Sequence, residues 1–366
     1  MASETSFEYE SDWVEHFNAV LKNEIRDEID NKNSIKANIV ESNQTLDEFI
    51  SRNANMDIIP LSKEPFFHNI RIRKGSSEIF FYINNENPRF WTIHNIEKQK
   101  AISEIIKEFT TNTFQQDTIY LSNKTMEVHQ KAFNANSLGL TLNFEQKFNE
   151  TKENPVFSEP IENFDDIGYT LQLWPKHPKS ISFFLEKFRA IKCPINYRSL
   201  NYVFEDFETQ EVIIKEDLHS DGSFTIHRGK DIKQHLKFVR SVKEKYSNSM
   251  DEVEEYRFNW GDSKGELFTF NLDKKVNPKY FIQAINQTKE FKIYCFFMYE
   301  ENDYLVYNCV DVHTGGKFYI QINPEEIHIF LEKDSCGNII FRFAQNLHTF
   351  FSVTTELLLD EEKLEI

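Results

Sequence analysis

The sequence has little glycine and lacks several motifs that mark common enzyme classes. Glycine accounts for 10 of 366 residues, well below its usual share of about 7%. The dinucleotide-binding pattern GxGxxG, the phosphate-binding pattern GxxxxGK[ST] and the zinc-protease pattern HExxH do not occur. A glycine-rich loop that cradles phosphates is therefore not expected, and we predict no cofactor.

Long apolar runs and a secretory leader are also missing from the sequence. The apolar runs fall far short of the roughly 20 residues that a membrane-spanning helix needs. The first residues, MASETSFEYESDW, have neither the basic flank nor the apolar core of a signal peptide. We therefore expect a cytoplasmic protein without a membrane partner.

Cysteine is sparse, and its spacing does not favour a metal site. The four cysteines contain no CxxC pair and have no nearby histidine at zinc-ligand spacing. We expect them to be buried, reduced thiols. They are Cys193, Cys295, Cys309 and Cys336.

What is present indicates a large globular α+β protein. Hydrophobic residues make up 40% of the chain and charged residues 28%, with 35 phenylalanines and 14 tyrosines. A chain of this length suits two or three domains. Stretches with helical and with strand periodicity alternate along it, which predicts antiparallel sheets with helices packed on one face.

Two helices are predicted near the N-terminus. Apolar residues at steps of four form one stripe over residues 11–31. A second helix, ending near Arg52, is predicted by Thr45 as N-cap with Glu48 three residues later, which is a capping-box pattern. The stripe of the first helix consists of Trp13, Phe17, Leu21, Ile25 and Ile29.

From about residue 56 the pattern favours strands. FFHNIRIR and EIFFYI are predicted to form a hairpin joined through 74–77. Pro88 fits the first turn of a helix, and Ile102, Ile105, Ile106 and Phe109 form a helical stripe after it. TIYLSNKTMEVHQ and LGLTLNF are then predicted to be strands.

The clearest strand signal lies in residues 291–344. Five apolar runs, KIYCFFMY, YLVYNCVDV, KFYIQI, IHIFLE and IIFRFA, are separated by turn sequences rich in Gly, Asn, Asp and Pro. This alternation predicts a β-meander of five strands.

Two sequence patterns recur along the chain and indicate a repeat. Gly75 to Pro88 and Gly265 to Pro278 have the same spacing, with a looser copy from Gly168 to Pro178. DLHSDGSFTI, starting at Asp217, also matches DVHTGGKFYI, starting at Asp311. The alternatives are a threefold repeat and a chance similarity between α+β segments.

The repeat hypothesis gives a division into segments. Residues 149–161 and 247–255 have the composition of linkers. We predict an N-terminal helical segment at 1–55, a first module at 56–155, a relatively basic middle module at 156–250 and a β-rich module at 251–366.

The two matching Asp-x-His sequences are candidate metal ligands. Asp217 with His219, and Asp311 with His313, each place a carboxylate and an imidazole on the same face of an extended segment. Together they would supply four ligands for zinc or a hydrolytic metal ion. The alternative is that both sequences simply form turns between strands.

Charge is distributed unevenly along the chain. The protein carries a net charge of −17, yet residues 168–250 contain 14 basic and 10 acidic side chains. Such a basic segment favours binding to phosphates, or to acidic surfaces of the same protein or a partner. The candidate nucleic-acid-binding residues are Lys187, Arg189, Lys230, Lys233, Lys237 and Arg240.

The sequence therefore favours a non-enzymatic scaffold or complex subunit that binds another protein through sheet edges and charged surfaces. Nucleic-acid or nucleotide binding through the basic middle module is one alternative. A metal-dependent hydrolase that uses the two Asp-x-His pairs is the other. The sequence does not indicate an oligomeric state.

Overall fold

Two units of the chain are defined by their internal contacts. The computed structural model describes residues 6–24, 35–75, 77–96, 99–112, 114–132, 137–144, 156, 169–174, 179–190, 195–206, 208–259, 265–351, 355–359 and 362–363. The first unit comprises Met1–Ile119, Phe133–Gly139 and Ser199–Lys245. The second unit comprises Tyr120–Ala132, Leu140–Arg198 and Tyr246–Ile366.

Each of these units combines several separate segments of the chain, whereas each segment expected from the sequence is one continuous stretch. The segments 1–55, 56–155, 156–250 and 251–366, and the threefold repeat behind them, stay a prediction. The expected fold class is confirmed, because the chain is α+β with an N-terminal helix and antiparallel sheets.

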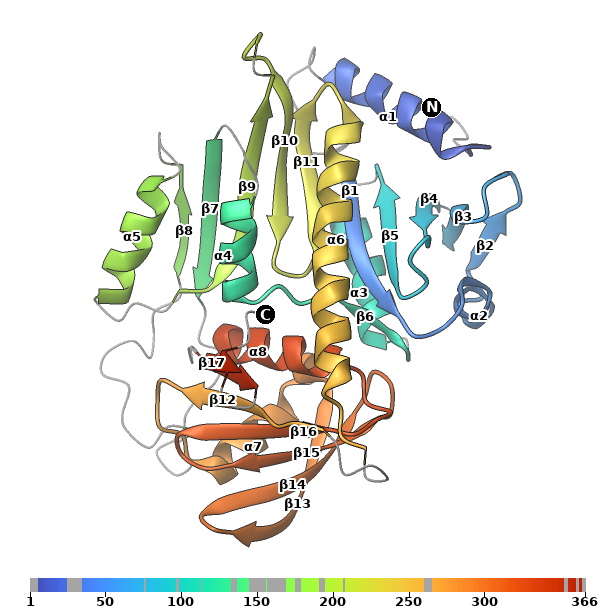
Figure 1. The fold of residues 1–366 in the computed structure, drawn as a ribbon. Helices are drawn as coiled ribbons and strands as arrows, with labels where there is room; N and C mark the ends of the chain where they lie inside the picture. The colour runs from blue at the N-terminus through green and yellow to red at the C-terminus, as the bar shows by residue number, and fades with distance from the viewer. Residues whose placement is uncertain are drawn as a thin grey trace. The chain divides into compact units, whose positions relative to one another are not determined.

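The first unit is built on a twisted antiparallel sheet (Figure 1). Its strand order is β2-β3-β4-β5-β1-β11-β10-β9, and the short strand β6 pairs with β1. The expected hairpin through residues 74–77 is confirmed as β3 and β4. The strands are β1 (Lys36–Ser42), β2 (Met56–Ile59), β3 (Phe67–Lys74), β4 (Ser77–Asn84), β5 (Phe90–Asn95), β6 (Gln116–Thr118), β9 (Tyr197–Glu205), β10 (Val212–His219) and β11 (Ser223–Gly229).

Helices α2 (Leu46–Arg52) and α3 (Gln99–Asn112) pack on one face of this sheet. Phe49 of α2 contacts Trp91 of β5 and Phe109 of α3, with ring centroids 5.7 and 5.2 Å apart. Alternate residues of β4, including Phe81, point to the same side and join this core.

The other face of the sheet carries α1 (Glu10–Glu24) and α6 (Ile232–Glu255). Phe17 of α1 packs edge-on against Tyr82 of β4, at 5.7 Å between ring centroids. Phe238 of α6 packs against Tyr202 and Phe224 of the sheet. Residues 232–245 of α6 belong to the first unit and the remainder of the helix to the second.

The second unit contains a seven-stranded antiparallel sheet in the order β13-β14-β15-β16-β12-β17-β18. Residues that alternate along β15 and β16 are fully buried, as a sheet covered on one face requires. The strands are β12 (Phe268–Leu272), β13 (Ile293–Glu301), β14 (Tyr304–Asp311), β15 (Lys317–Ile322), β16 (Glu326–Leu331), β17 (Thr355–Leu359) and β18 (Glu362–Lys363).

Helices α7 (Pro278–Gln287) and α8 (Asn338–Phe351) supply the core of this unit, and the 3₁₀ turn Lys289–Phe291 follows α7. Phe343 of α8 contacts Phe270 of β12 at 5.4 Å between ring centroids. Phe351 of α8 contacts Phe281 of α7 at 4.5 Å. The unit also contains α4 (Asn123–Ala132), α5 (Lys179–Ala190), β8 (Tyr169–Leu173) and residues 140–144 of β7 (Ser137–Phe144), which pair with β8 in antiparallel fashion.

The β-meander is confirmed for four of its five runs, but the fifth is wrong. IIFRFA belongs to helix α8 rather than to a strand. The run is only six residues long and has a single polar residue, Arg342, and a short apolar run of this kind fits a helix as well as a strand.

Two further expectations between residues 88 and 130 are wrong. Pro88 does not begin a helix, because strand β5 starts at Phe90 and its aromatic and β-branched residues favour extended backbone. TIYLSNKTMEVHQ is mainly helix α4 rather than a strand. Ser122 caps this helix by accepting a hydrogen bond from the backbone N–H of Thr125 at 3.1 Å.

The predicted N-terminal helices are present. Trp13, Phe17 and Leu21 are buried on α1 as expected, while Ile25 and Ile29 lie outside the described residues. The capping box of α2 is confirmed, with the Glu48 N–H donating to the Thr45 hydroxyl and the Thr45 N–H donating to the Glu48 carboxylate. Pro278, as expected, is the first residue of helix α7.

Replacing Thr45 with alanine removes the hydroxyl that satisfies the first turn of α2. We expect Thr45→Ala to lower the free energy of unfolding by about 1 kcal/mol, measured by urea denaturation. Thr45→Ser keeps the oxygen and is the control. Equal stability of the alanine and serine variants would contradict the capping role.

Candidate functional site

A cavity of about 350 Å³ opens beside helix α6 in the first unit. We call it the α6 cavity. Three basic side chains of α6, Lys233, Arg240 and Lys243, line it together with apolar residues of the same helix. Its carboxylates come from α1 and from the segments that follow β2 and β4; they are Glu10, Glu15, Glu64 and Glu86.

The β5 strand contributes His94 to the same cavity. His94 is 4% exposed and packs edge-on against Trp13 and His235, with ring centroids 4.8 and 5.6 Å away. Burial lowers the pKa of His94 well below its ordinary value, and His235 and Lys243 lower it further. The ring is therefore neutral at neutral pH.

Behind His94 lies a fully buried pair on the sheet and α6. His235 Nδ1 is 2.5 Å from Glu216 Oε2, and both side chains are completely buried. A carboxylate oxygen accepts, so the imidazole donates from Nδ1. This contact fixes the orientation of His235, against which His94 packs.

Two charged groups of the α6 cavity are markedly desolvated. Burial lowers the pKa of Lys243, although Glu86 and Glu10 act in the opposite direction. Burial raises the pKa of Glu10, although a hydrogen bond donated by Asn84 at 3.2 Å opposes this. Both shifts indicate charges that are only partly compensated by their surroundings.

The structure separates the predicted basic residues into different settings. Lys233 and Arg240 line the α6 cavity, whereas Lys237 is exposed on the same helix and is not among the lining residues. Lys230 forms an ion pair with Glu211 at 2.6 Å. Lys187 lies on α5, in the second unit, with its Nζ 5.3 Å from the ring centre of Phe183; the side chain of Arg189 lies outside the described residues.

The first Asp-x-His sequence forms the expected turn between strands, β10 and β11. Its Asp217 carboxylate contacts His227 across the hairpin, at 2.8 Å, and accepts a hydrogen bond from Asn201 at 2.6 Å. The closest imidazole partner of Asp217 is therefore His227, on β11, rather than His219.

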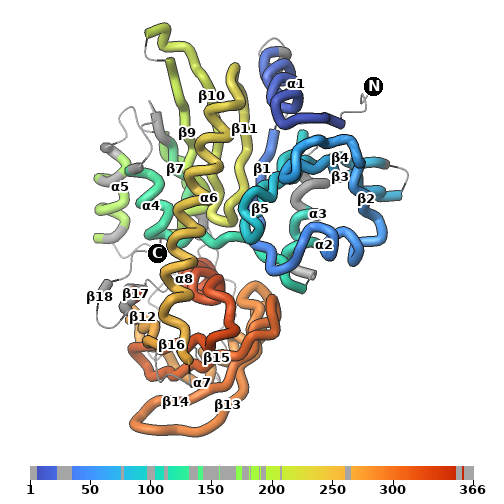
Figure 2. Tube along the Cα trace, turned by 45° about the vertical axis from the view of Figure 1, so that its right-hand side comes forward, coloured from blue at the N-terminus to red at the C-terminus, as the bar shows by residue number. Residues whose placement is uncertain are grey.

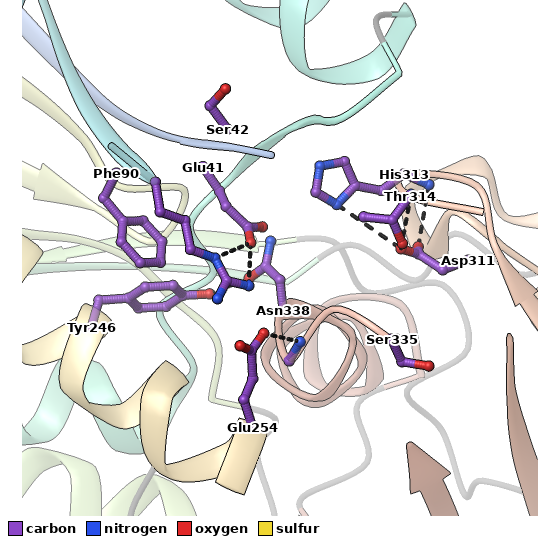
Figure 3. A network of polar contacts seen from close by, with 12 residues as sticks. Glu41, Ser42, Phe90, Tyr246, Glu254, Asp311, His313, Thr314, Ser335 and Asn338 are labelled. Atoms are coloured by element: carbon purple, nitrogen blue, oxygen red, sulfur yellow. Dashed lines mark hydrogen bonds and ion pairs between the residues drawn. The ribbon is translucent and has the colours of Figure 1, made fainter. Parts of the chain in front are cut away.

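The second Asp-x-His sequence forms the expected turn between β14 and β15. Asp311 is fully buried, and its carboxylate accepts hydrogen bonds from the backbone N–H groups of His313 and Thr314 and from the Thr314 hydroxyl (Figure 3). It also forms an ion pair with Arg342 of α8. The carboxylate therefore organises the turn and anchors a helix.

The two Asp-x-His pairs belong to different units, Asp217 and His219 to the first and Asp311 and His313 to the second. The metal-site hypothesis, which requires all four side chains in one place, stays a prediction.

Several residues of the α6 cavity were not predicted from the sequence. His94 and the glutamates lie far from Lys233 and Arg240 along the chain, and no spacing rule connects them. One motif was also missed, because Gly261 to Gly265 reads GDSKG and matches the hydrolase pattern GxSxG. Its Ser263 lies outside the described residues, and the motif falls between helix α6 and strand β12, the reverse of the strand-to-helix setting of a hydrolase nucleophile.

A second candidate surface lies on β13, the edge strand of the sheet in the second unit (Figure 2). Five of the six side chains from Tyr294 to Tyr299 are exposed by 45% to 61%. We call these five exposed residues the β13 patch: Tyr294, Phe296, Phe297, Met298 and Tyr299. The buried Cys295 lies between the first two of them. Exposed apolar surface of this extent on an edge strand is typical of an interaction site.

The cysteines fit the expectation of buried thiols. Cys295, Cys309 and Cys336 are buried and form no disulfide bonds, while Cys193 lies outside the described residues. Cys295 and Cys309 lie directly opposite each other on β13 and β14. Burial raises the pKa of Cys309 well above its ordinary value, so this thiol is protonated at neutral pH.

These features define an α+β protein whose described residues form two antiparallel sheets with helices packed on them. The chain belongs to the MJECL33-like protein family, whose model matches residues 1–366. A relative from Methanocaldococcus jannaschii, named as the uncharacterized protein MJECL33, is 26% identical over 376 aligned residues that cover 91% of this chain and 87% of the relative. Among the described helices, none is both long enough and apolar enough to cross a membrane.

The Asp217 carboxylate gives a test at acidic pH. Burial alone raises its pKa, but the hydrogen bond and the charge of His227, together with Asn201, outweigh burial and bring the pKa below the ordinary value of 3.8. A carboxyl whose pKa is lower in the folded state contributes fully above pH 3.8 and loses this contribution as the pH falls through the folded-state pKa.

We therefore expect Asp217→Asn to be less stable than the parent protein at pH 7, by about 1.5 kcal/mol for a charge-assisted hydrogen bond. The difference should shrink as the pH falls below 3.8. Urea denaturation of both proteins at several pH values measures it. Asp221→Asn, at an exposed turn position, is the control. A difference that grows toward low pH would contradict the assignment.

Proposed function

We propose that this chain acts as a non-enzymatic subunit of a cytoplasmic protein assembly, and that it associates with a second copy of itself through the β13 patch. The observation that carries the proposal is the exposure of Phe296, at 61%, and Phe297, at 59%, on an edge strand. Fully covering an aromatic side chain stabilises an association by about 1.5 to 3 kcal/mol relative to leaving it in water.

The charges at the two ends of β13 favour a second copy as the partner. Lys289, Glu290 and Lys292 precede the strand and leave a net positive charge there, whereas Glu300 and Glu301 end the strand and Asp303 follows it. A two-fold axis through the middle of the strand makes the two copies run antiparallel. Each basic end then faces the acidic end of the other copy, which gives electrostatic complementarity.

The backbone of β13 favours contact through side chains rather than through one long continuous sheet. The Cys295 N–H donates to the Asn286 side chain at 2.8 Å, and the Asn286 amide donates to the Cys295 carbonyl at 2.9 Å. These bonds occupy the outer edge of the strand at Cys295. The aromatic side chains on either side of it stay available for packing.

Three buried thiols support the cytoplasmic setting of this proposal.

Replacing Phe296 with serine should weaken self-association at least tenfold without unfolding the protein, because the side chain is exposed. Sedimentation equilibrium over a wide range of protein concentrations measures the dimer dissociation constant. Phe66→Ser, at a phenylalanine that is 50% exposed in the first unit, is the matched control. A parent protein that stays monomeric at all concentrations would overturn the proposal.

Charge exchange tests the two-fold arrangement. Lys289→Glu and Glu301→Lys should each weaken the dimer, since each places like charges against each other at both ends of the contact. The double variant exchanges the two charges and should recover most of the lost affinity. If the dimer of the double variant dissociates more readily than the dimer of either single variant, the antiparallel arrangement is wrong. Exchange of Lys237 and Glu244 on α6 is the control, and we expect it to leave the dimer unchanged.

A further inference from the structure

The charged side chains of the α6 cavity are sorted by the element that carries them. All three basic groups, Lys233, Arg240 and Lys243, come from α6, where steps of seven and three residues place them on one face of the helix. The four glutamates come from α1 and from the segments after β2 and β4. A cationic side and an acidic side therefore meet in one cavity.

These opposite charges do not neutralise each other by direct contact. Among the residues that the structure describes, no ion pair joins Lys233, Arg240 or Lys243 to any of the four glutamates of the cavity. The nearest charges act on one another from further away, as Glu86 and Glu10 do on Lys243. Among the three basic groups Lys243 is buried, whereas Lys233 and Arg240 are exposed. A buried charge such as Lys243 without a contact partner costs free energy, which a ligand of opposite charge recovers.

The cavity also offers a neutral polar group. His94 Nε2 is buried and makes no hydrogen bond to the residues that the structure describes. A buried ring nitrogen without a partner is costly in a folded protein. A polar ligand atom in the cavity can satisfy it, since His94 is one of the lining residues.

A ligand that carries only negative charge fits this cavity poorly. A phosphate held by Arg240 and Lys243 would also lie in the field of Glu10 and Glu86, which repels it. A simple cation has the opposite problem with the three basic groups of α6. A ligand that carries both charges satisfies both sides, and a volume of about 350 Å³ is at the small end of ligand pockets.

We propose that the α6 cavity binds a small zwitterion of the amino-acid class. The ligand carboxylate binds Arg240 and Lys243, and its ammonium group binds Glu10 and Glu86. Val14, Leu236 and Val239 line the same cavity and cover the aliphatic part of the ligand. This binding is independent of self-association through the β13 patch, because every lining residue belongs to the first unit.

A series of unbranched amino acids tests the proposal and measures the spacing of the two charges. Glycine, β-alanine, γ-aminobutyrate and 6-aminohexanoate carry the same two groups at increasing separation. The measurement is isothermal titration calorimetry of the full chain with each compound, at final concentrations of about 1 mM and about 10 mM, which suit the dissociation constants of weakly bound metabolites. We expect at least one member of the series to show saturable binding. Hexanoate, hexylammonium and inorganic phosphate serve as probes with a single kind of charge.

Variants of the two sides complete the test. Arg240→Gln and Glu86→Gln should each weaken binding of the preferred amino acid at least tenfold. Lys237→Gln, at an exposed basic residue of α6 outside the cavity lining, should leave it unchanged. Circular dichroism confirms that each variant is folded, as expected for substitutions of side chains around an open cavity.

The proposal is overturned if no member of the series binds, or if hexanoate or phosphate binds as tightly as the preferred amino acid. Equal binding of phosphate would identify an anion site and return attention to nucleotides. Binding that survives both Arg240→Gln and Glu86→Gln would place the ligand elsewhere on the chain.

Discussion

In each unit, a buried carboxylate on the sheet holds a long helix in place. Asp311 at the end of β14 forms an ion pair with Arg342 of α8, and Glu216 of β10 contacts His235 of α6. Removing one member of such a buried pair typically costs about 3 to 5 kcal/mol, because the other charge stays buried alone. The helices that cover the sheets are therefore fixed by a specific polar contact as well as by apolar packing.

The positions of these helices decide which surfaces are left for function. In the second unit, Ile293 and Cys295 of β13 are buried, with Asn286 of α7 bonded to Cys295, while the residues that follow on β13 are exposed. In the first unit, α6 lies on the sheet beside α1, and their charged residues surround a cavity instead of closing on one another. The α6 cavity thus lies beside a helix that a buried polar contact holds on the sheet, and the β13 patch lies beyond the point where α7 contacts its strand.

The sequence predicted the features that depend on neighbouring residues. The capping box at Thr45, the start of α7 at Pro278 and the turns at Asp217 and Asp311 each arise from chemistry within four or five residues. The prediction failed where a short apolar run suits a helix and a strand equally, as at the start of α8, and at Pro88, because proline also precedes strands. The basic residues Lys233 and Arg240 were recognised, but the glutamates that face the same cavity come from positions more than 140 residues away and could not be connected to them.

The two hydrogen bonds between Asn286 and Cys295 bear on the size of any assembly that uses β13. An edge strand with all its backbone groups open can recruit one chain after another and grow without limit. Here the amide side chain of Asn286 occupies the backbone groups of Cys295, one of the positions at which a neighbouring strand would bond. Contacts made by side chains about a two-fold axis use the same surface on both copies, so the self-association proposed for β13 would close at two chains and leave no free end for fibre growth.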